Sequence, residues 1–402
     1  MLLSDTPLIT TIATALGLAL VLGFLATRIK LPALIGYLLA GIIIGPFTPG
    51  FVANTAIASE LAEIGVMLLM FGVGLHFSLD DLLEVRKIAL PGALLQILVA
   101  TALGAGVATA WGWGLGAALV FGLALSVAST VVLLQALEAR GALESINGRI
   151  AIGWLIVEDL AMVLTLVLLP PLAEVLGGVT PNDESGNLWQ ALGLTMIKVT
   201  TFIALMLLVG RRVFPALLWQ VARTGSRELF TLCVVATAVS IAYAATFLFG
   251  VSFALGAFFA GMVMRESEFS HRAAEESLPL REAFAVLFFV SVGMLFNPLV
   301  LVEQPLQVLA VVGIIIIGKS LAATALVLTF RYPLNTALTV SASLAQIGEF
   351  SFILAGLGLR LKLLPPEGQS LILAGALISI ALNPLVFASV KPFQRWIQSR
   401  SR

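Results

Sequence analysis

The chain reads RIAIGWLIVEDLAMVLTLVLLPPLA over residues 149–173. This run is almost wholly apolar and has about the length that an α-helix needs to cross a bilayer, roughly 20 residues. Glu158 and Asp159 interrupt it near its middle. A charge at the centre of a membrane helix costs about 2.5–3.5 kcal/mol, so such residues are retained for pairing or for function. The run therefore predicts a membrane helix that carries part of a functional site.

The composition of the whole chain agrees with a membrane protein. Of its 402 residues, 60% are hydrophobic and 11% are charged, whereas about a quarter of the residues of a soluble domain are charged. Lys and Arg together number 22, as do Asp and Glu, so the chain has no basic excess for binding nucleic acid. We expect an all-α polytopic protein whose main surroundings are the lipid bilayer.

Apolar runs recur along the chain, separated by polar or Gly/Pro-rich loops. Thirteen of them are candidate membrane helices. They centre near residues 8–27, 33–47, 60–76, 88–110, 114–137, 149–173, 190–217, 228–248, 251–264, 281–297, 305–329, 334–359 and 368–392. The second and ninth are short for a crossing, so we expect them to tilt or to thin the bilayer locally.

The positions of Lys and Arg test this number independently, because both accumulate in cytoplasmic loops. If the N-terminus lies outside, eighteen of the 22 basic residues are cytoplasmic and two, Arg360 and Lys362, are not. Lys198 and Lys319 lie inside predicted spans. We therefore expect thirteen spans with the N-terminus outside and the C-terminus in the cytoplasm, with Arg360 and Lys362 as an exception.

Two pairs of segments indicate an internal duplication. IGYLLAG at residues 35–41 matches LGAFFAG at 255–261, and LLMFGVGLHF at 68–77 echoes LFFVSVGMLF at 287–296. The two offsets are 220 and 219 residues. Matches of Gly/Ala-rich apolar text are weak singly, but the common offset favours a true repeat.

The repeat also predicts a symmetry. Seven spans separate each helix from its counterpart, and an odd number places the two halves in opposite orientations, as in many secondary transporters. We expect repeat one at about 33–173 and repeat two at about 251–392. In such proteins the substrate binds near the midplane, where interrupted helices from both repeats meet.

Few ionisable residues lie inside the predicted spans. The acids are Glu158, Asp159 and Glu349, and the central cation of the second half is Lys319. We interpret Asp159 as the carboxylate that binds a cation and a proton in turn, and Lys319 as a compensating charge near Glu158. Neighbouring helix residues point about 100° apart, so Glu158 and Asp159 cannot both face one ligand unless the helix axis opens locally. We therefore expect Asp159 to face the ion and Glu158 to face Lys319, or the converse. The alternative is a purely structural Glu–Lys pair.

Two polar stretches complete the predicted site. SVASTV at residues 126–131 and QIGE at 346–349 lie at matching places in the two halves. Their hydroxyl, amide and carbonyl oxygens can replace the hydration shell of an alkali ion. Ser129, Thr130 and Gln346 are therefore candidate ion ligands, Gly348 is a candidate helix break, and Glu349 is an electrostatic or structural partner. For an isolated membrane serine such as Ser126, a bond to its own backbone is the simpler interpretation.

Other kinds of site find no support in the sequence. The two histidines are far apart and the single cysteine has no second cysteine to act with, so the sequence contains no metal-site spacing. The only metal ion that we expect is the transported monovalent cation. No phosphate-binding loop and no potassium-channel filter motif occurs. We expect no enzymatic activity and no cofactor.

Taken together, the motifs resemble the Kef-type potassium efflux transporters of bacteria, in the monovalent cation:proton antiporter-2 family. The resemblance covers nearly the whole chain. It is carried by Gly36–Gly41 with Gly45–Pro46, Leu68–Leu75, Ser129–Val132, Glu158–Asp159, Arg265–Glu268, Phe288–Met294 and Ser343–Phe352.

This resemblance implies an antiporter of the bacterial inner membrane that exchanges K+ for H+. It implies a homodimer with a sodium/proton-antiporter-like fold, whose fifth and twelfth spans would be crossed, discontinuous helices. The mobile core would comprise helices at about 88–173 and 305–392, and the remainder would be the dimerisation scaffold. The core of such transporters slides past the scaffold like an elevator, and Asp159 would bind the ion.

Two departures from the family pattern affect these expectations. Many Kef-type transporters have Gln-Asp at the place where this chain has Glu158-Asp159. Relative to that pattern, Glu158 adds a titratable group. Relatives also commonly carry a cytosolic nucleotide-binding domain after the membrane part, and this sequence stops at Arg402. We expect a truncated chain or an unregulated form, with any regulatory domain or subunit absent from it. Na+/H+ exchange at the same site, and a gated cation channel or sensor, remain the alternatives.

Overall fold

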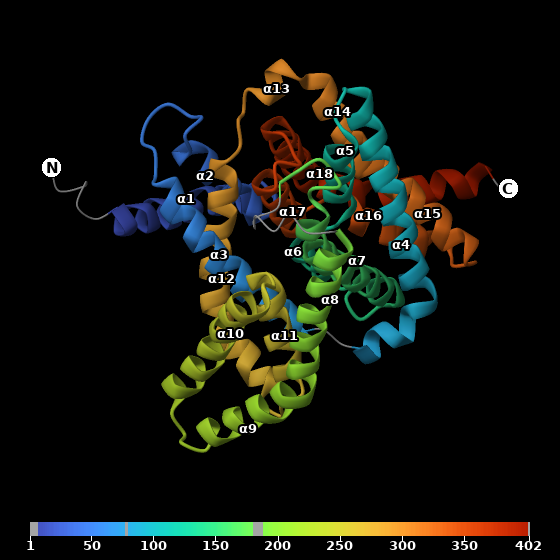
Figure 1. The fold of residues 1–402 in the computed structure, drawn as a ribbon. Coiled ribbons are helices and arrows are strands. Elements are labelled where there is room, and N and C mark those ends of the chain that lie inside the picture. The colour runs from blue at the N-terminus through green and yellow to red at the C-terminus, as the bar shows by residue number, and fades with distance from the viewer. Residues whose placement is uncertain (1–6, 77–78, 180–187, 401–402) are drawn as a thin grey trace. The chain divides into compact units, whose positions relative to one another are not determined.

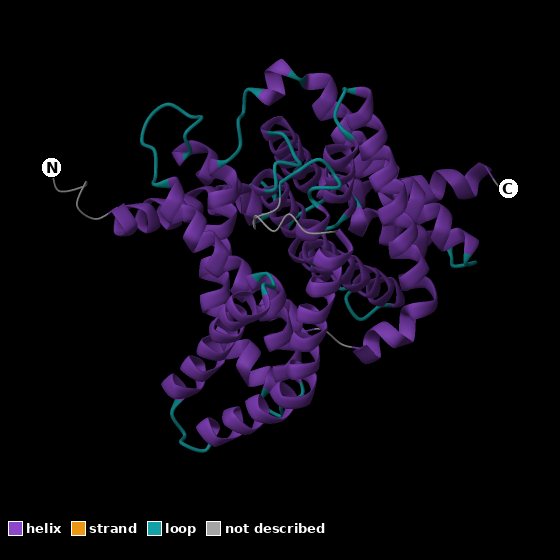
Figure 2. Ribbon diagram, in the orientation of Figure 1, coloured by secondary structure: helices purple, strands orange, loops and turns teal. Residues whose placement is uncertain are grey.

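The computed structural model describes residues 7–76, 79–179 and 188–400, and within them all regular structure is helical (Figure 2). Figure 1 colours the helices in chain order from blue to red. The helices are α1 (Pro7–Arg28), α2 (Ala33–Ile44), α3 (Thr55–His76), α4 (Leu79–Ala110), α5 (Leu115–Ser126), α6 (Thr130–Glu138), α7 (Ile146–Leu172), α8 (Leu188–Leu205), α9 (Arg211–Ala222), α10 (Arg227–Phe249), α11 (Phe253–Arg265), α12 (Ser270–Met294), α13 (Val300–Glu303), α14 (Pro305–Gly313), α15 (Lys319–Thr329), α16 (Leu334–Leu344), α17 (Glu349–Arg360) and α18 (Pro366–Arg400). A π-helical turn joins α8 to α9, and another joins α14 to α15.

The fold class is the predicted one, but the number of complete spans is lower than thirteen. In the described residues ten helical segments are long and apolar enough to cross a membrane, or eleven if the bent pair α16 and α17 is one span. The second and ninth predicted spans correspond to α2 and α11, which have 12 and 13 residues. At about 1.5 Å per residue, each falls well short of a hydrocarbon core about 30 Å thick.

The helices group into two compact units, which we describe separately. The first unit comprises the described residues within 1–25, 36–77 and 184–295. The second comprises those within 26–35, 78–183 and 296–402.

Glycines bring the helices of the first unit into backbone contact. A Cβ atom added to Gly41 of α2 would overlap with α12 at Gly293, and one added to Gly261 of α11 would overlap with α3 near Gly74. Small residues at such crossings are typical of membrane helices, because they let the backbones approach closely. In the sequence matches Gly41 corresponds to Gly261 and Gly74 to Gly293, so both crossings use the same pair of matched positions.

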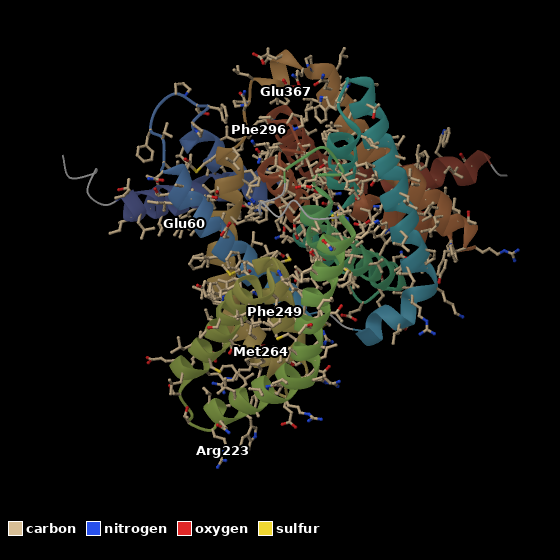
Figure 3. All side chains as sticks on the ribbon, in the orientation of Figure 1. Glu60, Arg223, Phe249, Met264, Phe296 and Glu367 are labelled. Carbon is tan, nitrogen blue, oxygen red and sulfur yellow. The ribbon has the colours of Figure 1, made fainter. Side chains whose placement is uncertain are left out.

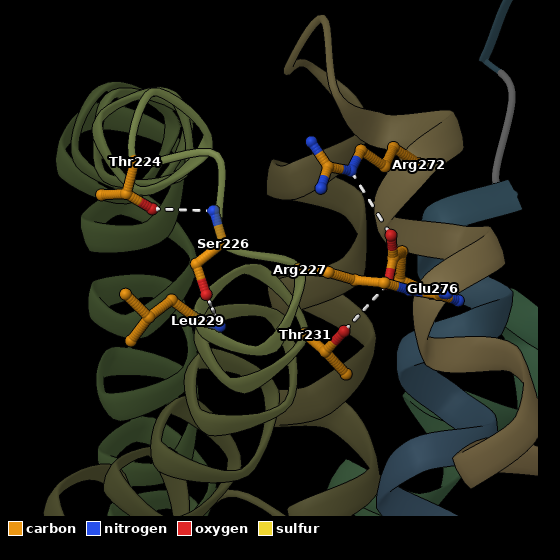
Figure 4. A network of polar contacts seen from close by, with 7 residues as sticks. All are labelled: Thr224, Ser226, Arg227, Leu229, Thr231, Arg272 and Glu276. Carbon is orange, nitrogen blue, oxygen red and sulfur yellow. Dashed lines mark hydrogen bonds and ion pairs between the residues drawn. The ribbon is translucent and has the colours of Figure 1, made fainter.

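Polar contacts join α10 to α12 in the same unit (Figure 4). Glu276 of α12 accepts hydrogen bonds from Arg227 Nε at 2.9 Å and from Thr231 Oγ1 at 3.0 Å, both on α10. Arg272 approaches the second carboxylate oxygen at 3.5 Å. At the nearby end of α9, the exposed Arg223 points away from the helices (Figure 3), with its guanidinium 4.7 Å from the Trp219 ring.

The second unit has an apolar core built around Trp154 of α7. Trp154 is fully buried, and its ring occupies the place that a side chain at Gly92 of α4 would need. Helices α4, α6, α7, α15 and α16 all contribute to this core. Glu158 follows Trp154 by one helical turn and so lies on the same face of α7. Packing of the tryptophan therefore directs Glu158 toward the interior of the unit.

Both discontinuous helices belong to the second unit. The chain is extended at Val127 between α5 and α6, and Ser129 caps α6 by accepting the Val132 N–H through its hydroxyl at 3.3 Å. The axis between α16 and α17 bends by 43° across residues 345–348. The fifth predicted span, 114–137, is thus two half-helices, as is the twelfth, 334–359.

Candidate functional site

The breaks in the two discontinuous helices touch each other inside the second unit. The Ser129 N–H donates to Gln346 Oε1 at 2.8 Å, and Gln346 Nε2 donates back to the Ser129 carbonyl at 3.2 Å. A Cβ atom at Gly348 would collide with the side chain of Ser129. The close approach therefore requires glycine at position 348. Gln346 accepts from the Ser129 N–H, which the break leaves without a helical acceptor, and it shares the Ser129 carbonyl with the Leu133 N–H.

Glu349 closes the contact from the other side. It is the first residue of α17 and is 1% exposed. Its carboxylate accepts from Ser129 Oγ at 2.8 Å and from the Thr130 N–H at 3.2 Å. The carboxylate thus lies at the N-terminal end of α6, where the helix dipole and free N–H groups stabilise a negative charge.

Glu158 lies next to the first break, and each of its carboxylate oxygens accepts a hydrogen bond. Gln96 Nε2 of α4 donates to Oε1 at 2.6 Å, and the Ala128 N–H of the break donates to Oε2 at 2.9 Å. The side chain is fully buried. Two N–H donors on one carboxylate favour its ionised form.

Lys319 lies at the second break and is also fully buried. Its Nζ donates to the Gln346 carbonyl at 3.0 Å, just beyond the end of α16, where the helix dipole favours a cation. Its charge interacts with that of Glu158, but none of the ion pairs between described residues joins the two. The structure thus gives Lys319 a carbonyl partner and a longer-range attraction to Glu158, rather than a direct ion pair.

Asp159 differs from the other two acids in its partners. Thr130 Oγ1 donates to Oδ2 at 3.2 Å, while the buried Oδ1 has no hydrogen-bond partner among the residues that the structure describes. The residue is 5% exposed, and the charges of Glu158 and Glu349 both act on it. A buried carboxylate oxygen without a donor is costly unless a proton or a cation occupies it.

The charge of the cluster supports this conclusion. Three buried carboxylates, Glu158, Asp159 and Glu349, share the site with one buried ammonium, Lys319. Fully ionised, the cluster would hold two uncompensated negative charges. Buried charges of this kind are neutralised by a proton or paired with a cation.

All the site residues that were predicted from the sequence lie in the second unit. Ser129, Thr130, Gln346, Gly348 and Glu349 meet at the two breaks. Glu158, Asp159 and Lys319 surround this contact as described above.

Sequence reasoning missed two buried amides. Gln96 holds Glu158, and Asn383 Nδ2 of α18 donates to the Ala342 carbonyl in the last turn of α16 at 2.9 Å. Both residues are nearly inaccessible to solvent. The only signal in the sequence is an isolated amide within an apolar run.

No resident metal is indicated by the side chains present. Among residues 7–76, 79–179 and 188–400, no group of three or more His, Cys, Asp or Glu residues is arranged to hold a metal ion. A single free carboxylate oxygen instead suits an ion that binds and leaves.

Comparisons with known proteins place the chain among described families and folds. Residues 15–390 match the family model described as sodium/hydrogen exchanger, transmembrane. The chain is 61% identical over 390 residues to the Escherichia coli protein named "Putative cation/proton antiporter YbaL", covering 96% of this chain and 69% of that protein. It is 35% identical over 362 residues to "K(+) efflux antiporter 6" of Arabidopsis thaliana, covering 89% of this chain and 59% of the plant protein.

The fold has a solved counterpart. The sodium proton antiporter MjNhaP1 from Methanocaldococcus jannaschii superposes with a TM-score of 0.72, covering 94% of this chain and 96% of the other at 17% sequence identity. The family and the fold are those of multi-pass membrane transporters rather than of enzymes.

Proposed function

Because the chain belongs to the sodium/hydrogen exchanger family, we propose that it exchanges K+ for H+ across the bacterial inner membrane. Asp159 is the carboxylate that binds the cation and the proton in turn. The observation that carries this role is the buried Asp159 Oδ1, which has no hydrogen-bond partner although both oxygens of Glu158 have one.

Exchange follows from competition for this one oxygen. A proton on Asp159 neutralises the carboxylate and removes its attraction for a cation, while a bound cation disfavours the proton. The carboxylate must carry one or the other to be stable in a buried site, so the empty, charged form is disfavoured. Thr130 Oγ1 and the polar groups of Ser129 and Gln346 contribute further oxygen ligands.

We propose an elevator-type movement, because every group of the site belongs to the second unit. Helices at about 88–173 and 305–392 form the mobile core and carry the ion, and the remainder is the scaffold through which two copies form a homodimer. Inverted repeats at about 33–173 and 251–392 are supported by the matched glycine crossings, Gly41 with Gly293 and Gly261 with Gly74.

The choice of K+ rests on the relatives. The name of the Arabidopsis relative specifies K(+) efflux, whereas the antiporter of similar fold is named for sodium. Its 17% identity supports the fold alone. Na+/H+ exchange at the same site is therefore the second candidate.

Reconstituted vesicles test this function. Purified protein is placed in proteoliposomes that contain a pH-sensitive dye, and K+, Na+ or choline is added outside under an imposed pH gradient. We expect K+ to move protons at lower concentration than Na+, with no response to choline. Proton movement with Na+ but not with K+ would show that Na+ is the transported cation. Cation flux without proton movement would contradict exchange and indicate a channel.

A further inference from the structure

We propose that Gln96 is a positioning residue that keeps Glu158 away from the transported cation, so that Asp159 is its single carboxylate ligand and the site rejects divalent cations. This inference rests on the proposed function and assigns its ion specificity to hydrogen bonds outside the ion-binding oxygens. Neither the family match nor the neighbouring motifs point to Gln96.

The first step is the direction of the Gln96 amide. Its Nε2 lies 2.6 Å from Glu158 Oε1 and 3.4 Å from the Ser126 carbonyl oxygen, the last residue of α5. A backbone carbonyl only accepts hydrogen bonds, so it requires the amide nitrogen, and not the oxygen, to face this side. In this orientation Gln96 presents a donor to Glu158.

Gln96 itself lies in a tightly packed part of α4. It lies on α4, one turn after Gly92, where the Trp154 ring of α7 packs directly on the helix backbone. Trp154 and Glu158 are in turn one helical turn apart on α7. The donor and the acceptor are thus fixed by the same tight helix contact, and holding the pair together costs little additional conformational entropy.

The three buried acids differ in the hydrogen-bond donors that they receive. Glu158 is bound by Gln96 Nε2 and the Ala128 N–H, and Glu349 by Ser129 Oγ and the Thr130 N–H. Each of these four donors occupies a carboxylate oxygen. Of the three acids, only Asp159 keeps a buried carboxylate oxygen with no hydrogen-bond partner among the described residues.

The number of free carboxylate oxygens determines the kind of cation. Ca2+ and Mg2+ are hard ions that need several oxygens, usually including more than one carboxylate, to replace their tightly held water. A site with one available carboxylate suits a monovalent ion, whose hydration is weaker. If Glu158 were released, its flexible side chain, on the residue directly before Asp159 in α7, would be free to turn toward the cation.

The decisive variant is Gln96→Met, which keeps the length of the side chain and removes the donor. In the proteoliposome assay we expect K+/H+ exchange to persist and its inhibition by external Ca2+ or Mn2+ to occur at concentrations lower by about tenfold or more, the size expected for losing a hydrogen bond to a charged group. Gln135→Met, at an exposed position of α6, is the matched control and should leave inhibition unchanged.

A double variant separates positioning from a general structural effect. Gln96→Met combined with Glu158→Gln removes the second carboxylate, so sensitivity to Ca2+ should return to that of Glu158→Gln alone. Persistent sensitivity in the double variant would contradict the inference, as would unchanged Ca2+ inhibition in Gln96→Met.

If Gln96→Met does not fold, inhibition of the native protein by Ca2+ is measured at K+ concentrations near the KM for K+. Strong competition by Ca2+ would then show a two-carboxylate site and contradict the inference. Absence of cation-dependent proton movement in the native protein would instead contradict the proposed function.

Discussion

Hydrogen-bond donors distinguish the three buried carboxylates of the second unit. Glu158 and Glu349 each receive two donors, and Asp159 receives one, from Thr130 Oγ1 at 3.2 Å. A carboxylate that changes partners during transport has to keep one oxygen free of hydrogen-bond donors from the protein. The difference in partners, rather than in burial, therefore singles out Asp159.

Thr130→Val removes the hydroxyl that contacts Asp159 while keeping a branched side chain of similar size. A hydrogen bond of this kind contributes about 0.5–1.5 kcal/mol, so we expect the KM for the cation to change by up to about tenfold with exchange retained. Thr165→Val is the control, because the Thr165 hydroxyl bonds only the Ala161 carbonyl of its own helix. Concentration curves in proteoliposomes measure the change, and equal KM values for the two variants would contradict the ligand role.

Lys319→Met leaves the Gln346 carbonyl without its donor and Glu158 without its nearest positive charge. Loss of one partner from a buried charged arrangement costs on the order of 3 kcal/mol. We expect a clearly lower Tm in detergent than for Lys198→Met, which changes an exposed lysine of α8. Equal thermal unfolding curves for the two variants would show that Lys319 does not compensate the acids.

The charged members of the site were predictable from the sequence, and the amides were not. Glu158, Asp159 and Lys319 are conspicuous because a charge inside an apolar run has few explanations. Gln96 and Asn383 are neutral, and a neutral amide in a membrane helix can bond almost anywhere. Only the fold shows that one reaches Glu158 and the other the end of α16.

Among the elements, the two discontinuous helices carry most of the chemistry. Each break exposes N–H and C=O groups that a continuous helix would satisfy internally. In the first break the Ala128 and Thr130 N–H groups bind Glu158 and Glu349. In the second, the Gln346 carbonyl binds Lys319.

Gly348→Ala tests the contact between the breaks. The added methyl group would collide with Ser129, so the two breaks must separate, and we expect both lower stability and loss of exchange. Gly356→Ala is the control, because nothing lies within 4 Å of its added Cβ atom and alanine is favoured over glycine in a helix by about 0.5–1 kcal/mol. Exchange at the native rate in Gly348→Ala would contradict the need for this contact in transport.

The sequence indicated these elements only in part. Apolar runs located the spans well, since length and hydrophobicity are local properties. The division of 114–137 into α5 and α6 was expected only from the family resemblance, because residues 126–129 contain no glycine or proline that would mark a break. The shortness of α2 and α11 was expected, but thirteen complete spans was too many.

The orientation of the whole molecule in the membrane is still a prediction from loop charges. It can be measured by replacing Cys233, the single cysteine, with serine and adding one cysteine at an exposed loop position. We expect a membrane-impermeant thiol reagent to label Glu303→Cys in intact cells and to label Thr224→Cys only after lysis. The reverse pattern would place the N-terminus in the cytoplasm.

In the proposed mechanism, exchange by the whole molecule depends on one carboxylate that alternates between a cation and a proton. The most direct measurement is K+-dependent proton movement in proteoliposomes that contain Asp159→Asn, beside Glu138→Gln, which neutralises an exposed acid of α6. We expect Asp159→Asn to show no exchange while remaining folded, with a Tm at or above that of the native protein, because a neutral side chain no longer needs an ion in a buried site. Proton-coupled K+ movement by Asp159→Asn at a rate comparable to that of Glu138→Gln would contradict the assignment of Asp159.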